Sequence, residues 1–176
     1  MTEEKLKAMD RQAFNRAACN CMVGTLRNLN LREPIKKIIY GEFDDGAYVR
    51  IIYKAHYEYT IDTDKDTIAM LTDIINYLIE YEGNADLKKN PVWGEYPIES
   101  DLCNTLGFTK EGKNLSNMAL WYAKEGSRMN LQFDDSDDWK TAPVSEDGLL
   151  MIRDVIDYIA KEGPKHGKHG RQTEDM

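Results

Sequence analysis

Residues 49–61 alternate between apolar and polar side chains, and this run constrains the fold more than any other feature of the sequence. Every odd position is apolar or aromatic, and every even position except Ile52 is polar. Because successive side chains of a strand point to opposite faces, the pattern predicts a sheet with one buried and one wet face, as antiparallel sheets have. The run is longer than an ordinary strand, so we expect a bend or turn near residues 54–56.

A second β-rich stretch, residues 35–43, precedes this run. Asp44-Asp45-Gly46 lies between the two stretches and is typical of a hairpin turn. An amphipathic pattern then predicts a helix over residues 64–82, with Thr63 as its N-cap. Upstream, residues 3–29 are predicted to form a long N-terminal helix, which Pro34 prevents from continuing. The first half therefore reads as a helix, a hairpin and a second helix.

The second half of the chain restates this order. Residues 83–97 contain two prolines and two glycines and read as a connector, and a short helix is predicted over residues 100–106. A hairpin turning at Lys124-Glu125-Gly126 follows, and then a helix capped by Ser145. When residues 66–78 are aligned with 147–159, five pairs are identical: Asp66/Asp147, Met70/Met151, Asp73/Asp154, Ile75/Ile156 and Tyr77/Tyr158.

An internal repeat of residues 35–82 as 117–163 would explain the identities, and so would chance similarity between two amphipathic helices. Either way we expect an α+β fold: an antiparallel sheet built from two hairpin-plus-helix units and preceded by a long N-terminal helix. Residues 1–163 are predicted to form a single domain. Residues 164–176 carry no periodic apolar pattern and are predicted to be a disordered tail.

Charge is distributed unevenly over the chain. The net charge is −8, but residues 1–40 hold eight Lys and Arg against four Asp and Glu, whereas residues 41–163 hold twelve against twenty-five. Such an acidic body repels nucleic-acid and membrane phosphates and attracts basic protein surfaces. No apolar run is long enough to cross a membrane, and the three cysteines form no C-x-x-C pair. A cytoplasmic protein with reduced cysteines is expected.

The densest acidic stretch is Asp134, Asp135, Asp137 and Asp138, directly before Trp139. A calcium loop of the EF-hand type needs glycine at its sixth position, but a loop starting at Asp134 would have Trp139 there. No metal site is therefore predicted. The stretch is interpreted either as a solvated strand-to-helix loop or, together with Asp44 and Asp45, as an acidic recognition patch.

No pattern for catalysis or cofactor binding is found. The sequence has no G-x-S-x-G nucleophile motif, no phosphate-binding P-loop and no G-x-G-x-x-G after a strand. His56 is the one histidine outside the tail and lies on the polar side of its strand pattern, which favours a surface histidine. We predict no catalytic residues and no cofactor, and an enzyme of unrecognised type is the lowest-ranked alternative.

The composition thus favours a non-enzymatic acidic binding protein, an inhibitor or adaptor with the physical profile of immunity proteins, antitoxins or phage anti-defence proteins. Its expected partner is a basic protein surface, such as that of a nuclease or other nucleic-acid enzyme. The predicted contact set combines the acidic residues with one aromatic anchor: Asp44, Asp45, Asp134, Asp135, Asp137, Asp138 and Trp139.

The alternative is a single-stranded nucleic-acid-binding protein. A basic aromatic strand face would be formed by Lys36, Lys37, Tyr48, Arg50, Lys54 and His56. The duplicated strand-rich unit ending in a helix resembles, superficially, the architecture of Whirly-type binders. The acidic body argues against this alternative, because attraction to phosphate would have to be local. A homodimer is compatible with each of these functions.

Overall fold

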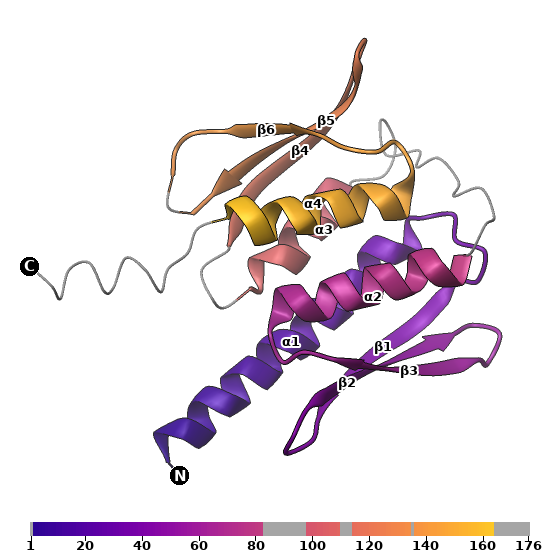
Figure 1. Ribbon diagram of the computed structural model, residues 1–176, viewed down its shortest axis with the longest axis vertical. Coiled ribbons are helices and arrows are strands. Elements are labelled where there is room, and N and C mark those ends of the chain that lie inside the picture. The colour runs from indigo at the N-terminus through magenta and orange to yellow at the C-terminus, as the bar shows by residue number, and fades with distance from the viewer. Residues whose placement is uncertain (1, 83–97, 110–113, 135, 164–176) are drawn as a thin grey trace, which may run out of the picture.

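The computed structural model describes residues 2–82, 98–109, 114–134 and 136–163 and has an α+β fold (Figure 1). The first unit consists of a long helix α1 (Glu3–Arg27), three strands β1 (Ile35–Glu42), β2 (Ala47–Tyr53) and β3 (Glu58–Thr63), and helix α2 (Thr67–Glu82). The second unit consists of α3 (Ile98–Gly107), β4 (Leu115–Ala123), β5 (Gly126–Phe133), β6 (Lys140–Pro143) and α4 (Gly148–Glu162). The predicted fold class is confirmed, with the strands arranged as two three-stranded antiparallel sheets, β1-β2-β3 and β4-β5-β6.

The expected bend in the alternating run is present and separates β2 from β3. His56 adopts a left-handed conformation with a φ of 69°, and its N–H donates to the carbonyl of Tyr53. The N–H of Tyr53 in turn donates to the carbonyl of Tyr57, which closes the turn. Buried and half-buried residues alternate along β2 as predicted. In β3 the alternation is weak, because Tyr57 and Tyr59 are exposed although their positions predicted burial.

The two units repeat each other in strand register. Ile35 lies opposite Tyr53 at the start of β1, and Leu115 lies opposite Phe133 at the start of β4. In both pairs the register shifts by one residue directly after this position. β-Bulges at equivalent positions indicate that the first two strands of both units have the same backbone geometry.

The connectors between the last strand and the last helix also repeat. The N–H of Asp66 donates to Asp64 Oδ1 before α2, and the N–H of Asp147 donates to Ser145 Oγ before α4. Asp73 accepts a hydrogen bond from the hydroxyl of Thr63 at 2.8 Å. Its equivalent in α4, Asp154, accepts from the N–H of Ser145, also at 2.8 Å.

Both predicted N-caps are corrected by this geometry. Thr63 ends β3 and bonds the side chain of Asp73, and Asp66 accepts from the N–H of Ala69 in the first turn of α2. The N-cap of α4 is Asp147, not Ser145. Before each helix a short polar side chain, through Asp64 Oδ1 or Ser145 Oγ, accepts from the N–H two residues further on, and side chains of this kind compete for backbone donors in turns.

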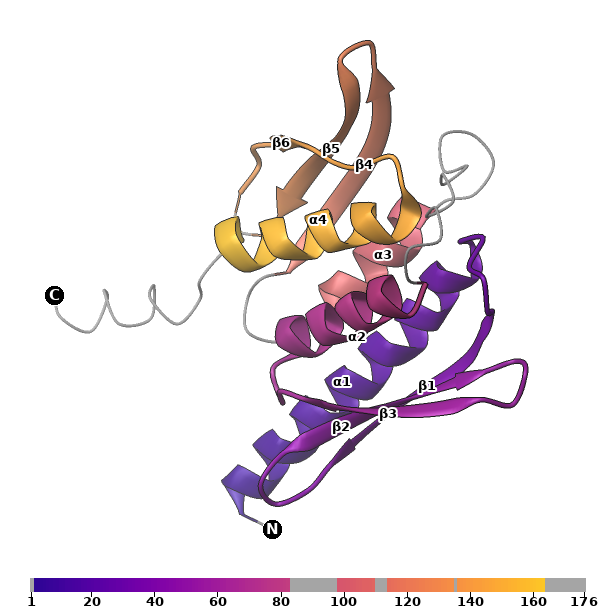
Figure 2. The same ribbon diagram turned by 45° about the vertical axis from the view of Figure 1, so that its right-hand side comes forward.

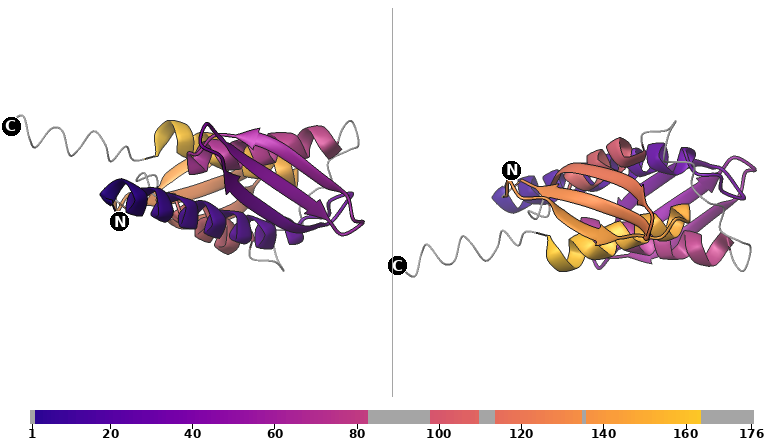
Figure 3. Two further views of the ribbon diagram at one scale, coloured as in Figure 1. Left: turned by 90° about the horizontal axis from the view of Figure 1, so that it is seen from below. Right: turned by 90° about the horizontal axis from the view of Figure 1, so that it is seen from above.

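The helices form a layer between the two sheets, which cover opposite sides of it (Figure 3). Helix α1 packs against α3, and α2 packs against α4. The hydroxyls of Thr25 and Thr105, at equivalent places in α1 and α3, meet at 3.5 Å. The core contains the inner faces of both sheets and the facing sides of the helices, with Val49, Ile51, Leu71, Leu131 and Ile156 fully buried.

One short strand was not predicted. Residues 140–143 were expected in a loop, but they form β6 and pair with residues 128–131 of β5. Of its residues only Ala142 is buried, so the strand has too little apolar pattern to be recognised. The predicted connector 83–97 and the predicted tail 164–176 lie outside the described residues.

None of the helices in the described part of the chain combines the length and the apolar character needed to span a membrane.

Candidate functional site

The first candidate site is the connector between β5 and β6, which carries the acidic stretch. Asp134, Asp137 and Asp138 are exposed, and Trp139 exposes 50% of its surface. The backbone is held by short hydrogen bonds: Ser136 Oγ accepts from the N–H of Asp138, and the carbonyl of Asp137 accepts from Gln132 Nε2, both at 3.1 Å. The loop is therefore tethered to β5 while its carboxylates point into solvent. Asp135 lies outside the described residues.

The second candidate site is the turn between β1 and β2. Asp44 and Asp45 are exposed, and Phe43 beside them exposes 61% of its surface. The Phe43 ring packs on Tyr48 with ring centroids 4.9 Å apart. Tyr48 in turn lies so close over Gly41 that a Cβ at that position would overlap its ring. Both acidic loops thus combine exposed carboxylates with an exposed aromatic ring.

The structure does not merge these two acidic loops into one patch. They belong to different sheets, which lie on opposite sides of the helical layer (Figures 1 and 3). Within the described part of the chain three ion pairs occur, Glu3–Lys7, Arg11–Glu42 and Arg50–Glu58, and none of them involves either loop. The described members of the predicted contact set therefore lie on two separate surfaces, and their carboxylates form no ion pair with a described cation.

Among the described residues no group of three or more His, Cys, Asp or Glu side chains is arranged to hold a metal ion.

The basic strand face of the alternative function is only partly assembled. Tyr48 and Arg50 lie on the outer face of the first sheet, with the Arg50 guanidinium 5.8 Å from the centre of the Tyr48 ring. Arg50 is also paired with Glu58 on β3, Nε to Oε1 at 2.8 Å, and Asp62 lies opposite Tyr48. The face is consequently close to neutral.

The remaining basic residues of that set lie at the ends of the face. Lys54 and His56 are exposed in the turn between β2 and β3, and Lys36 is exposed beside the bulge of β1. Lys37 is exposed on β1 and lines a small cavity of about 170 Å³ together with Arg16 and Asn20.

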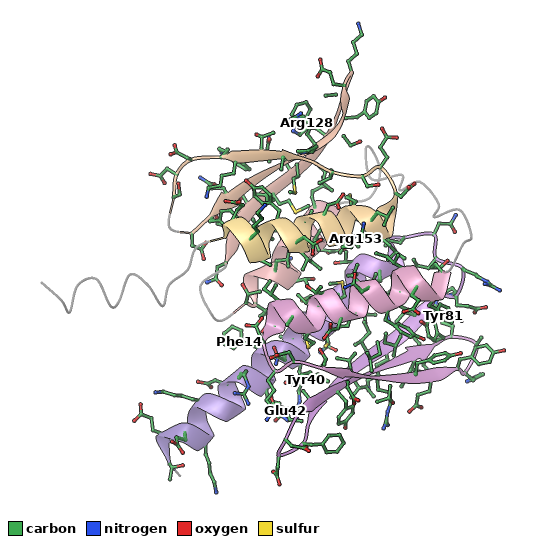
Figure 4. All side chains as sticks on the ribbon, in the orientation of Figure 1. Phe14, Tyr40, Glu42, Tyr81, Arg128 and Arg153 are labelled. Carbon is green, nitrogen blue, oxygen red and sulfur yellow. The ribbon has the colours of Figure 1, made fainter. Side chains whose placement is uncertain are left out.

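A cluster of tyrosines was not recognised as a site in the sequence. Tyr53 on β2, Tyr59 on β3, and Tyr77 and Tyr81 on α2 form a continuous set of ring contacts, with centroids 4.9 to 5.9 Å apart. Tyr81 is labelled on α2 in Figure 4. The i, i+4 spacing of Tyr77 and Tyr81 was the signal available, because such residues share one helix face.

The hydroxyls of this cluster have an unusual environment. Those of Tyr53 and Tyr77 are buried and neither has a partner at hydrogen-bond geometry. Burial first, and then the nearby Tyr77 hydroxyl, raise the pKa of Tyr53. Tyr53 therefore stays uncharged at neutral pH, and the cluster reaches the surface at Tyr59, which exposes 41% of its area.

Two cysteines line one cavity of the described chain. A cavity of about 420 Å³ is lined by Cys21 of α1, by Cys103 of α3 and by neighbouring residues up to Ser116 of β4. Burial and the Asp101 carboxylate raise the pKa of Cys21, and burial and Asp134 raise the pKa of Cys103. Both side chains are therefore neutral thiols at pH 7, whereas a nucleophilic cysteine needs a lowered pKa.

Comparison with known proteins identifies no relative: no family model, no curated protein and no solved structure matches this chain.

Proposed function

We propose that this protein is a non-enzymatic acidic binding protein, an inhibitor or adaptor that engages a basic surface of a protein partner through its acidic loops. The observation that carries the proposal is the β5–β6 connector. There, three described aspartates and a half-exposed Trp139 share one tethered loop without an ion-pair partner in the described chain. Unneutralised carboxylates around an aromatic side chain are the combination that a basic partner would recognise.

The turn of Phe43, Asp44 and Asp45 supports the same function as a second contact. It repeats the combination of exposed carboxylates with an exposed aromatic ring. Since the two loops lie on opposite sides of the helical layer, a partner would contact one of them at a time, or wrap around the molecule. We assign the primary contact to the β5–β6 connector, which has the larger charge and the larger aromatic ring.

The chemistry of the partner follows from the sign of the charge. Carboxylates of the connector would pair with Arg and Lys side chains, and the Trp139 ring would stack on a guanidinium or fill an apolar recess. Basic surfaces of this kind are found on nucleases and other nucleic-acid enzymes, where they contact phosphates. An acidic protein bound there would block access of the nucleic acid.

The test distinguishes partner binding through the charges of the two acidic loops from binding through the total negative charge of the protein. One variant changes Asp44, Asp45, Asp134, Asp137 and Asp138 to Asn. A matched control removes the same number of charges from exposed carboxylates outside the two loops, namely Glu4, Glu80, Glu125, Asp157 and Glu162. Each protein is used to capture partners from a lysate of its source cells, and the captured proteins are identified and then purified for binding measurements at several salt concentrations.

We expect the wild type and the matched control to retain a basic nucleic-acid enzyme that the loop variant loses, and the affinity to fall as salt rises. Trp139→Ala should weaken the same complex by more than tenfold if the ring is an anchor, on the order of 1–2 kcal/mol. Equal binding by the loop variant and the matched control would refute the role of the loops.

Binding to single-stranded nucleic acid is the alternative, and one observation favours it: Tyr48 and Arg50 are in contact on an open sheet face. Its test is a binding titration of single-stranded DNA with the wild type and with Arg50→Gln. Salt-sensitive binding that is lost with this substitution and survives the loop substitutions would replace the first proposal with this one.

A further inference from the structure

The four sheet edges of the described chain differ in how they are protected against pairing with another strand. The β1 edge carries Lys36, Lys37 and Glu42, and the β3 edge carries Glu58 and Asp62. The β6 edge is four residues long and contains Lys140 and Pro143. Charges, proline and short length are the usual devices that keep an edge unpaired.

The β4 edge has none of these devices. Its nine residues, LSNMALWYA, include no charged residue and no proline. It pairs with β5 on one side, and no described strand pairs with its other side. Trp121 exposes 38% of its surface and Tyr122 exposes 62%. Together with β5 it forms a hairpin that extends past α4 into open space (Figure 2).

In the first unit helix α1 covers the inner face of β1, the strand that is equivalent to β4. There, Ile38 and Tyr40 on the inner face of β1 are buried, and Arg11 of α1 reaches Glu42 at the end of the strand. In the second unit α3 begins at Ile98, whose counterpart in α1 is Ala18. The counterparts of the first half of α1, residues 83–97, lie outside the described residues.

The inner face of β4 is less covered than the inner face of β1. Met118 and Leu120, the counterparts of Ile38 and Tyr40, are only partly buried. The strand thus presents free backbone groups on its edge and incompletely covered apolar side chains beside them. Both features are satisfied by one more strand, added in the plane of the sheet.

We propose that β4 pairs with β4 of a second copy of this chain, antiparallel about a two-fold axis, and joins two three-stranded sheets into one of six strands. The argument for a second copy is charge. A strand that pairs with its own counterpart brings like residues together, which penalises any edge with a net charge. β4 is the one edge of the described sheets that carries no charge to repel itself.

The sequence of β4 is also complementary to itself in one register. An axis through Ala119, its middle residue, places Met118 opposite the partner copy's Leu120 on the inner face. The same axis places Trp121 opposite the partner copy's Asn117 on the outer face. Apolar residues thereby meet apolar residues on the covered side, and the regular stretch of the strand beyond the bulge, residues 117–121, pairs with the same stretch of the partner copy.

The test introduces a charged side chain at Ala119, which lies on the proposed two-fold axis. In Ala119→Glu two carboxylates would lie directly opposite each other, and in Ala119→Lys two ammonium groups would. Ile39→Glu is the matched control, because Ile39 holds the equivalent position on β1, opposite Arg50 as Ala119 is opposite Asn130. Analytical ultracentrifugation over a range of concentrations gives the dissociation constant, and circular dichroism checks that each variant folds.

We expect the wild type and Ile39→Glu to dimerise, and each Ala119 variant to dissociate at least roughly tenfold more readily. An equimolar mixture of the Glu and Lys variants should restore the dimer, because opposite charges then face each other. Ala119→Cys should form a covalent dimer under a mild oxidant, since Cα atoms of directly opposite residues lie about 4.5–5.5 Å apart, within disulfide range. Ile39→Cys should not.

A wild type that is monomeric at every concentration would overturn the proposal in favour of a foreign strand as the occupant of this edge. A dimer that Ala119→Glu leaves intact would overturn it as well, because the contact would then lie elsewhere. The proposal does not depend on the acidic loops, and their substitution is expected to leave dimerisation unchanged.

Discussion

Two buried tyrosines offer a test of how hydrogen bonding stabilises the first unit. Tyr40 and Tyr53 are 3% and 1% exposed, and both lie on the inner face of the first sheet. Tyr40 donates its hydroxyl proton to Glu42 Oε1 at 2.7 Å, whereas the hydroxyl of Tyr53 has no partner at hydrogen-bond geometry. The same substitution, Tyr to Phe, therefore removes a satisfied hydroxyl at one site and an unsatisfied hydroxyl at the other.

The two substitutions are expected to change the free energy of unfolding differently. Tyr40→Phe loses a hydrogen bond to a charged acceptor, which costs about 1.5–3 kcal/mol of unfolding free energy. In a chain of this length that lowers the melting temperature by roughly 3–12 °C. Tyr53→Phe removes a buried polar group that has lost its hydration without gaining a partner, so the change should lie between no loss and a gain of about 1 kcal/mol.

The assay is equilibrium unfolding in urea, followed by tryptophan fluorescence and by circular dichroism. Both variants should keep the wild-type m-value, so that the shift in midpoint reports stability alone. A Tyr53→Phe variant that loses as much stability as Tyr40→Phe would refute the reasoning, because the Tyr53 hydroxyl would then have to make a stabilising hydrogen bond with Tyr77 or another group.

Three further predictions concern charge, turn geometry and core packing. Glu42→Gln should cost about 1–2 kcal/mol at pH 7, discounted for a partner, Arg11, whose side chain is 37% exposed. Burial raises the pKa of Glu42, but the hydrogen bonds from Arg11 and Tyr40 and the nearby positive charge of Arg11 together lower it below its usual value, so this stability is present above the ordinary carboxyl pKa and is lost as the pH falls through the folded value; urea midpoints of variant and wild type should converge in acid. Gly126→Ala should destabilise by about 1 kcal/mol or more because Gly126 has a φ of +125°, whereas Gly46→Ala, in open space, should change thermal stability by less than about 0.5 kcal/mol. Ile156→Ala should cost about 2–5 kcal/mol in the same denaturation assay, because Ile156 is fully buried.

The elements that were predictable are those whose local pattern agrees with their packing. The long run of residues 49–61 alternates strictly, and its excess length alone indicated the turn at His56. The turn at Asp44-Asp45-Gly46 combines residues that favour tight turns, and it forms as expected. Where every residue of a segment favours the same structure, the sequence pattern is sufficient to predict that structure.

The missed features depend on contacts between distant parts of the chain. Tyr59 continues the apolar alternation of β2 into β3, but β3 is an edge strand and the described rings beside Tyr59 are those of Tyr53, Tyr77 and Tyr81, so its ring stays exposed. Thr63 has the chemistry of an N-cap, yet the long-range hydrogen bond to Asp73 holds it in the strand. Neither competition can be decided from a local window of sequence.

The candidate sites were predictable in composition and not in arrangement. The sequence identified Asp44, Asp45 and the aspartates before Trp139, and the described members of that set are exposed. Their separation onto two sheets follows from the packing of α1 on α3 and of α2 on α4, which no local pattern indicates. The uncharged edge of β4 could have been noticed from its sequence, but the partial burial of Met118 and Leu120 beside it required the structure.

The repetition of the two units explains why their surfaces can differ so much. Equivalent inner positions keep the same apolar character, as in the pair Val49 and Met129, because both sheets must cover the same helical layer. The loops carry no such constraint. The turn after β2 contains Lys54 and His56, whereas the equivalent connector after β5 contains the cluster of aspartates. A fold with matching frames can therefore present a basic turn after β2 and an acidic loop after β5.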